Sequence, residues 1–277
     1  MPAWGGRVNA EISPGNKDGA FPSVAQPVGA DNRRRYRLPF GFTPATPLYK
    51  HQAIGINALV RRADFALFDD PGLGKTVQTL YAFECLRQAG EVNACIVVAP
   101  KSAIDPWVEE IEKRLNGASV AIIAGKPRKE RLQLYRPGKA FYLINYDVLA
   151  SSACDGMFAF GGLELLRGDD AKALQRLLTL TRSMLVLDEC HRIKSPTAKT
   201  TRALLTLAPL AQRRVILTGT PVADRPEDLY ALMAFLNNAS LFGSTYYRFL
   251  EHYTIRQQMQ LRNGRTFKKI TGYKNLD

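Results

Sequence analysis

Hydrophobic residues fall into short runs over most of the chain, with the length and composition of strands that are buried on both faces. Six runs rich in Val, Ile, Leu and Phe are bounded by polar segments or by segments containing Gly and Pro. We predict strands at 65–68, 95–99, 120–124, 141–145, 184–187 and 215–217.

Longer segments between these runs have apolar residues at helical spacing. We predict helices at 53–62, 76–89, 106–115, 171–181, 199–208 and 227–236, with a further short helix at 244–252. Asp105 followed by Pro106 has the residue types that open a helix. The alternation of strands and helices predicts an α/β fold, with a parallel sheet covered by helices on both faces.

The two ends of the chain have a different composition. Residues 1–47 contain many Gly and Pro and the basic run Arg33 to Arg37, so we predict a flexible tail whose cations either bind phosphate or are simply solvated. Residues 48–240 form the predicted α/β lobe. Residues 241–277 contain seven Lys and Arg but only two acids, and Asn263-Gly264 is a hairpin signal. We predict a basic helix and hairpin that connect to a lobe outside these residues; a frayed tail or a linker is the alternative.

Composition narrows the classes of partner. Of the 277 residues, 46% are hydrophobic and 23% are charged, which is typical of globular proteins. The 38 Lys and Arg exceed the 25 Asp and Glu and give a net charge of +13. This excess favours phosphate-bearing partners. Four cysteines without C-x-x-C spacing and three histidines offer little material for zinc, which suits a reduced, intracellular protein. No apolar run is long enough to span a membrane, and we expect no membrane partner.

The first motif follows the predicted strand at 65–68. Asp69-Asp70-Pro71-Gly72-Leu73-Gly74-Lys75-Thr76 leads into a helix, which is the context of a phosphate-binding loop. Gly72 and Gly74 permit a tight turn, Lys75 would reach the β- and γ-phosphates, and Thr76 would hold Mg²⁺. The strict pattern G-x-x-x-x-G-K-[ST] has Gly where this chain has Asp69, so a simple turn is the alternative.

Two acids follow the predicted strand at 184–187. Asp188 and Glu189 would lie at the carboxyl end of a buried strand, where ligands of open α/β sheets bind. Adjacent acids in an apolar setting repel each other unless a cation or a proton is present. Asp188 would bind Mg²⁺ through its water shell, and Glu189 would deprotonate the water that attacks a γ-phosphate. An exposed acidic turn is the alternative.

Two further motifs are weaker indicators of function. Thr218-Gly219-Thr220 follows the strand at 215–217, and its hydroxyls would contact the acids and respond to the γ-phosphate, although a plain turn explains the same residues. Gln52 carries one donor and one acceptor, the pair that matches adenine, although a surface Gln is the simpler interpretation.

Taken in this order, the elements resemble the first RecA-like lobe of helicase superfamily two, and within it the Swi/Snf family of DNA-dependent ATPases. The resemblance covers residues 48–277. Leu48 to Gln52 is similar to the family's adenine-reading element. In the family's phosphate loop an Asp at position 69 is usual. Asp188 to His191 reads Asp-Glu-Cys-His where the family commonly has Asp-Glu-Ala-His.

The resemblance implies a RecA-like fold of the P-loop NTPase type, with ATP and Mg²⁺ as cofactors. The residues implied for catalysis are Lys75, Asp188, Glu189 and His191. Those implied for nucleotide binding are Gln52, Asp70, Gly72, Leu73, Gly74, Lys75, Thr76 and Val77, with Thr76 and Asp188 holding the metal.

The resemblance also implies contacts with DNA. Residues 96–112 look like an element that touches the DNA backbone, and Asn145-Tyr146 looks like another. The DNA-binding residues implied are Pro100, Lys101, Ser102, Asn145 and Tyr146; the coupling residues are Thr218, Gly219 and Thr220.

The family's second lobe carries the arginine fingers and is absent from these residues, so we expect a second RecA-like lobe as partner, in cis or in trans. The leading hypothesis is the ATP-binding lobe of a double-stranded DNA translocase that is nearly inactive alone. A superfamily-two helicase acting on RNA is a second possibility, which Leu241-Phe242-Gly243 and the closing Gly272 to Leu276 argue against. A third is a non-catalytic module that binds nucleotide or DNA.

Overall fold

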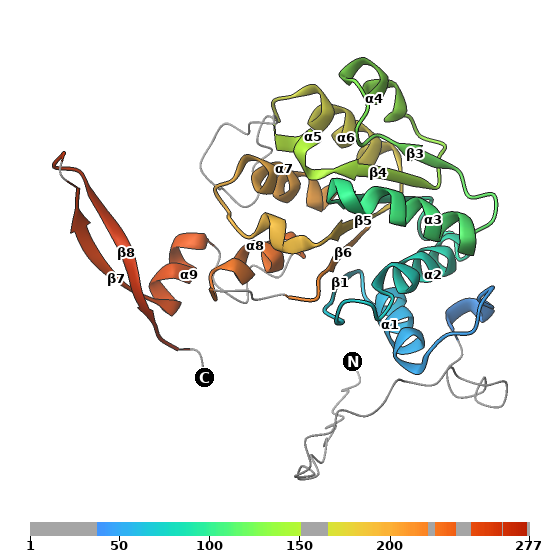
Figure 1. Cartoon of the computed structure of the whole chain (residues 1–277), viewed down its shortest axis with the longest axis horizontal. Helices are drawn as coiled ribbons and strands as arrows, with labels where there is room; N and C mark the ends of the chain where they lie inside the picture. Colours follow the sequence, from blue (N-terminus) through green and yellow to red (C-terminus); the bar gives the residue numbers. More distant parts are fainter. Residues whose placement is uncertain (1–37, 151–165, 221–224, 237–244, 262, 276–277) are drawn as a thin grey trace, which may run out of the picture.

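A computed structural model describes residues 38–150, 166–220, 225–236, 245–261 and 263–275 of the protein (Figure 1). Six strands form one sheet in the order β1-β6-β5-β2-β4-β3, and every neighbouring pair is parallel. Two further strands, β7 and β8, form an antiparallel hairpin that lies apart from the sheet (Figure 1). The predicted α/β fold is confirmed.

The elements follow the predicted order. The strands are β1 Asp64–Leu67, β2 Ala94–Ala99, β3 Val120–Ile122, β4 Phe141–Asn145, β5 Ser183–Asp188, β6 Arg213–Leu217, β7 Thr254–Gln260 and β8 Thr266–Tyr273. The α-helices are α1 Lys50–Arg61, α2 Lys75–Gln88, α3 Ile104–Arg114, α4 Arg128–Leu134, α5 Tyr146–Ala150, α6 Asp169–Leu180, α7 Lys199–Leu207, α8 Asp228–Phe235 and α9 Tyr246–Tyr253.

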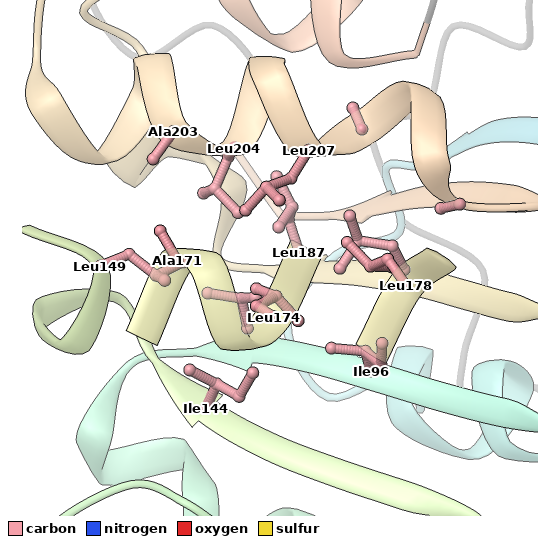
Figure 2. Packing of buried hydrophobic residues seen from close by; sticks show 14 of the residues in the cluster. Ile96, Ile144, Leu149, Ala171, Leu174, Leu178, Leu187, Ala203, Leu204 and Leu207 are labelled. Carbon is pink, nitrogen blue, oxygen red and sulfur yellow. The ribbon is translucent and has the colours of Figure 1, made fainter. Parts of the chain in front are cut away.

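Side chains alternate between two hydrophobic cores, one on each face of the sheet. In β2, Ile96 and Val98 belong to the core under α5, α6 and α7, whereas Cys95 and Val97 belong to the core under α1, α2 and α3. Figure 2 shows the first core, where Leu174 and Leu178 of α6 lie over the sheet. Because both faces are covered, the strands are apolar without a polar face, as the sequence pattern indicates.

Two helices are missing from the sequence prediction. Helix α4 has no buried residue, so it has no apolar periodicity to detect; Arg131 fixes it to α6 through an ion pair with Asp170 of 2.7 Å between Nη2 and Oδ2. Helix α5 has five residues and continues directly from β4, and such short helices have little periodic signal. Helix α3 begins at Ile104 instead of Pro106, because it continues from the 3₁₀ turn Lys101–Ala103.

Part of the predicted tail lies on the lobe. Leu38 is buried in the core under α1 and α2, the ring of Phe42 is 5.5 Å from that of Tyr81, and Thr46 accepts a hydrogen bond from Arg114. Residues 38–47 therefore contact α2 and α3, which their Pro-rich composition did not indicate. Residues 1–37 lie outside the described residues, and the boundary at residue 48 stays a prediction.

The hairpin extends further than Asn263-Gly264 suggests. Its strands pair from Thr254 with Tyr273 to Gln260 with Thr266, so the connection is longer than two residues. Gly264 adopts φ of +80°, which glycine tolerates, and its N–H bonds to the carbonyl of Leu261.

Among the described residues, no helix has both the length and the apolar character needed to span a membrane.

Candidate nucleotide-binding site

Strand register brings three motifs to one edge of the sheet. Leu67 of β1 and Asp188 of β5 both pair with Leu217 of β6, which lies between these strands. The three strands therefore end at the same level. The loop after Leu67, the acids at the end of β5 and the Thr-Gly-Thr segment after Leu217 consequently emerge side by side at the carboxyl edge, where ligands of such sheets bind.

The start of α2 has the geometry of an anion-binding helix end. The helix begins at Lys75 and follows Gly74, whose φ of +79° lies in the left-handed region. The N–H of Gln78 donates to the carbonyl of Gly74 at 3.0 Å, so the amides of Lys75, Thr76 and Val77 come before this hydrogen bond and have no acceptor within the helix. Free amides at a positive helix end suit a phosphate group.

Lys75 lies over its own loop. Its Nζ donates to the carbonyl oxygens of Asp69 at 2.8 Å and Asp70 at 3.3 Å. The ammonium also acts across the site, because its positive charge is one of the influences that lower the pKa of Asp188. The charge of Lys75 therefore influences the ionisation of Asp188.

Asp69, the residue that breaks the strict loop pattern, has a structural role. Its Oδ2 accepts a hydrogen bond of 2.8 Å from Nε2 of Gln78, which is fully buried in α2 and also lies 3.4 Å from the carbonyl of Leu73. A side chain at Gly55 of α1 would overlap Gln78 Oε1. Asp69 and Gln78 thus close the loop onto α2, and Gly55 leaves the space for that contact.

Gln52 also lies against the phosphate loop. Its Oε1 accepts from the N–H of Tyr49 at 3.1 Å, and its Nε2 donates to the carbonyl of Leu73 at 3.3 Å. A Cβ at Gly74 would come within 2.5 Å of Gln52 Nε2, so only glycine permits this approach. The predicted adenine-reading residue is thus placed next to the predicted phosphate loop, 21 residues away in sequence.

Asp188 is held by hydrogen bonds on both carboxylate oxygens. Trp107 donates its Nε1–H to Oδ2 at 2.8 Å, and the N–H of Glu189 donates to Oδ1 at 3.0 Å. Burial is the largest influence and raises the pKa of Asp188, the Glu189 carboxylate raises it further, and Trp107 and Lys75 lower it. A net upward shift marks a carboxylate short of positive charge, which a divalent cation would supply.

Glu189 adopts an unusual backbone conformation. Its φ of 49° lies in the left-handed region, which costs a residue with a Cβ about 1 kcal/mol and is seen at functional sites. The side chain is 41% exposed, and its Oε2 lies 3.3 Å from Nδ1 of His191. The strand thus ends with one acid held inward and the next turned toward solvent beside an imidazole.

Thr218, Gly219 and Thr220 contact the phosphate loop from the neighbouring strand. The hydroxyl of buried Thr218 accepts a hydrogen bond of 3.1 Å from the N–H of Thr220. A Cβ at Gly219 would lie 2.7 Å from Cδ of Pro71. Gly219 therefore packs against the loop, so a movement of one segment would displace the other.

The donors at this edge fit Mg²⁺. The described residues contain no group of three or more His, Cys, Asp and Glu side chains that would hold a metal by themselves. Mg²⁺ is commonly held by one or two protein groups together with substrate phosphates and water. Thr76 at the loop and Asp188 opposite it match that sparse donor set.

The residues predicted to face DNA separate into two groups. Lys101 and Ser102 are exposed in the turn before α3, whereas Pro100 is buried. Asn145 and Tyr146 are buried, and the Tyr146 hydroxyl donates to the carbonyl of Asp188 at 2.8 Å. Burial leaves little of either side chain accessible, and Tyr146 supports the acidic motif; that Asn145 and Tyr146 bind DNA stays a prediction.

Sequence reasoning did not identify Gln78 and Trp107 as site residues. Gln78 lies between Val77 and Leu80 in a helix that is buried over most of its length, and a polar residue within such a run is the signal that was available. Trp107 lies 81 residues before its partner Asp188, and nothing in the spacing indicates their hydrogen bond.

We predict that Trp107→Phe moves the lower pH limit of Mg²⁺-dependent nucleotide binding upward. The indole N–H lowers the pKa of Asp188, so its loss raises that pKa further. As a metal ligand, Asp188 would have to be ionised, which requires a pH above its pKa, so binding should fail at a higher pH than in the wild type. Titration of a fluorescent ATP analogue across pH measures the midpoint.

Tyr146→Phe is the matched control, because its hydroxyl bonds to the backbone carbonyl of Asp188 and not to the carboxylate. It should lose about 0.5–1.5 kcal/mol of stability without the same pH shift. An unchanged midpoint in Trp107→Phe would contradict this role for the indole.

Comparisons with known proteins agree with this geometry. The sequence profile of the family described as SNF2-related domain matches residues 51–266. The mouse "DNA excision repair protein ERCC-6-like" is 30% identical over 219 residues, which cover 76% of this chain and 16% of that protein. "Protein CHROMATIN REMODELING 24" of Arabidopsis thaliana is 28% identical over 230 residues, covering 76% of this chain and 19% of the relative.

A solved structure shares the fold. The "Sulfolobus solfataricus SWI2/SNF2 ATPase core in complex with dsDNA" is 25% identical, with a TM-score of 0.59, and the match covers 76% of this chain and 40% of that one. The chain therefore spans less than a fifth of the curated relatives named above and under half of the solved core. The match to 51–266 covers most of the sequence, and the chain belongs to the family of SNF2-related domains.

Proposed function

We propose that the chain is the ATP-binding lobe of a DNA-dependent ATPase that moves along double-stranded DNA by its backbone. The observation that carries the proposal is the convergence of Lys75, Thr76, Asp188 and Glu189 at one sheet edge in a chain of the SNF2-related family. A duplex DNA substrate also places the protein inside cells.

The lobe binds the nucleotide through its loop. The amides of Lys75, Thr76 and Val77 and the Lys75 ammonium bind the β- and γ-phosphates, while Gln52 pairs with the adenine edge. Lys75 exchanges its bonds to the carbonyls of Asp69 and Asp70 for phosphate oxygens. Gly72, whose φ of +86° lies in the left-handed region, allows the loop to turn there, and without a side chain its backbone can approach these oxygens.

Hydrolysis depends on the acids of β5. Asp188 and Thr76 hold Mg²⁺, which when bound neutralises charge that develops on the phosphates. Glu189 accepts the proton of the attacking water, and its position beside solvent gives that water access. His191, 3.3 Å from Glu189, orients the carboxylate. The contact of Gly219 with Pro71 transmits the state of the loop to the Thr-Gly-Thr segment.

We expect the protein to bind DNA through the phosphate backbone of the duplex. The structural relative is an ATPase core in complex with dsDNA, and the net charge of +13 suits a polyanion. On this lobe Lys101 and Ser102 are exposed at the start of α3, whose Trp107 bonds to Asp188. DNA contacts and the metal-binding acid are thus connected through one helix. A motor that moves along DNA contacts phosphates and does not read base sequence.

Two substitutions separate binding from chemistry. We expect Lys75→Ala to weaken nucleotide binding by about 10- to 100-fold, because charge-assisted hydrogen bonds are worth about 1.5–3 kcal/mol. Glu189→Gln should retain binding, and in a protein that includes the second lobe it should reduce turnover by about 10²-fold or more. Calorimetry with an ATP analogue and a phosphate-release assay measure the two effects.

Lys172→Ala, a change of the same charge at an exposed position of α6, is the control and should alter neither quantity. Unchanged affinity in Lys75→Ala would remove the phosphate-loop assignment. Wild-type turnover in Glu189→Gln would mean that Glu189 is not the base, and nucleotide binding without turnover in every context would favour a non-catalytic module.

We further expect residues 1–277 alone to hydrolyse ATP barely above background. Arginine fingers contribute roughly 10³–10⁵ in rate in other nucleotide hydrolases, and the resemblance assigns them to a second lobe. Phosphate release should therefore change little on adding duplex DNA and rise when the second lobe is supplied in cis or in trans. Strong DNA-stimulated turnover by the purified monomer would contradict the proposal that the active site needs residues of a second lobe.

A further inference from the structure

The hairpin of β7 and β8 is exposed along most of its length. Every described residue from Gln257 to Lys269 is exposed, and the hairpin projects from α9 at the end of the molecule away from the sheet (Figure 1). A two-stranded hairpin without a third strand or a covering helix is only marginally stable in water. Such an arm is therefore a candidate for binding a partner.

The hairpin carries charge of one sign. Residues 254–275 include six Lys and Arg and no Asp or Glu. Arg256, near the base, lies 3.9 Å from Glu251 of α9. Within the described part of the chain, Arg265, Lys268 and Lys269 have no carboxylate at ion-pair distance. The outer half of the arm thus presents uncompensated cations to solvent.

Both faces of the ribbon are polar. Strand pairing places Gln258 opposite Lys268 on one face, and Gln257 opposite Lys269 on the other. The second face also carries exposed Met259 and Phe267, which are a cross-strand pair. Each face therefore combines an ammonium with an amide, and apolar contact area is available on one of them.

The base of the hairpin is fixed to the lobe. The Tyr273 hydroxyl donates to Glu227 at 2.8 Å, immediately before α8, and the N–H of Lys274 donates to the carbonyl of Tyr253 at 3.0 Å. Thr254 is buried and bonds to the carbonyl of Leu250. These contacts fix the position of the base of the hairpin relative to α8 and α9.

We propose that this hairpin is a second DNA-binding element, an arm that lies in a groove of duplex DNA and binds phosphates through Arg265, Lys268 and Lys269. The inference rests on the proposed function and adds a contact remote from the nucleotide edge. A two-stranded ribbon fits the major groove, which is about 12 Å wide. The seven residues of β7 and the eight of β8 give the ribbon a length of roughly 23 Å, enough to follow several phosphates.

The same features disfavour other partners. A membrane-inserting hairpin has a mostly apolar tip, whereas Asn263, Gly264 and Arg265 lie at this tip beside one exposed apolar residue, Leu261. A second copy of this chain, with its net charge of +13, would repel a basic arm. Duplex DNA supplies regularly spaced negative charge and therefore matches lysines on both faces of the ribbon.

The test measures duplex binding as a function of salt. Fluorescence anisotropy of the 277-residue chain with a labelled duplex of mixed sequence, without nucleotide, compares the wild type with Lys268→Gln/Lys269→Gln. The control, Lys126→Gln/Lys129→Gln, removes the same charge from exposed positions in α4 and in the segment that joins it to β3, an edge strand of the sheet. Anionic phosphatidylserine vesicles replace DNA in a parallel titration, and a fluorescent ATP analogue checks the nucleotide site of each variant.

We expect the hairpin variant to reduce the slope of log affinity against log salt by about 1.8, at about 0.9 per phosphate contact, while the control keeps the wild-type slope. Nucleotide binding should be the same in all three proteins. Equal slopes in the two variants, or loss of vesicle binding but not of DNA binding, would overturn the arm while leaving the ATPase proposal intact. Failure of the wild type to bind any duplex would remove both the arm and the DNA substrate.

Discussion

Parallel pairing of β1, β6 and β5 is the constraint on which the site depends. Leu67, Leu217 and Asp188 lie in one row across these strands, so the phosphate loop, the Thr-Gly-Thr segment and the acids begin at the same level. The strands hold this register because apolar helices cover both faces, and a slip by one residue would exchange the two cores. The chemistry of the edge therefore follows from the packing of the sheet.

Polar contacts then fix the edge. The carbonyl of Leu73 accepts from Gln52 of α1 and lies 3.4 Å from Nε2 of Gln78 in α2, Asp69 accepts from Gln78, and Asp188 accepts from Trp107 of α3. The three helices of one face thus each hold part of the loop or the acid. A site positioned by its scaffold binds charged ligands with less reorganisation than a free loop would.

The sequence predicted the sheet well, because its strands are apolar runs such as Cys95 to Ala99 that have no polar face to confuse the pattern. It also located the phosphate loop and the acids, which are contiguous in sequence. Contacts between distant segments escaped it, among them Trp107 with Asp188 and Gly55 with Gln78. The burial of Tyr146 also escaped it, because a motif identifies a residue type but not its burial. The roles of the site residues as ligands of nucleotide, metal and DNA stay predictions.

Hydrogen–deuterium exchange of the 277-residue chain, measured by mass spectrometry with and without ATP and Mg²⁺, tests the central claim that one sheet edge forms one nucleotide site. The account predicts slower exchange in three segments together, 69–77, 188–191 and 218–220, and no change in the hairpin strands at 254–260 and 266–273. Protection of the phosphate loop alone, or unchanged exchange in all three segments, would contradict it.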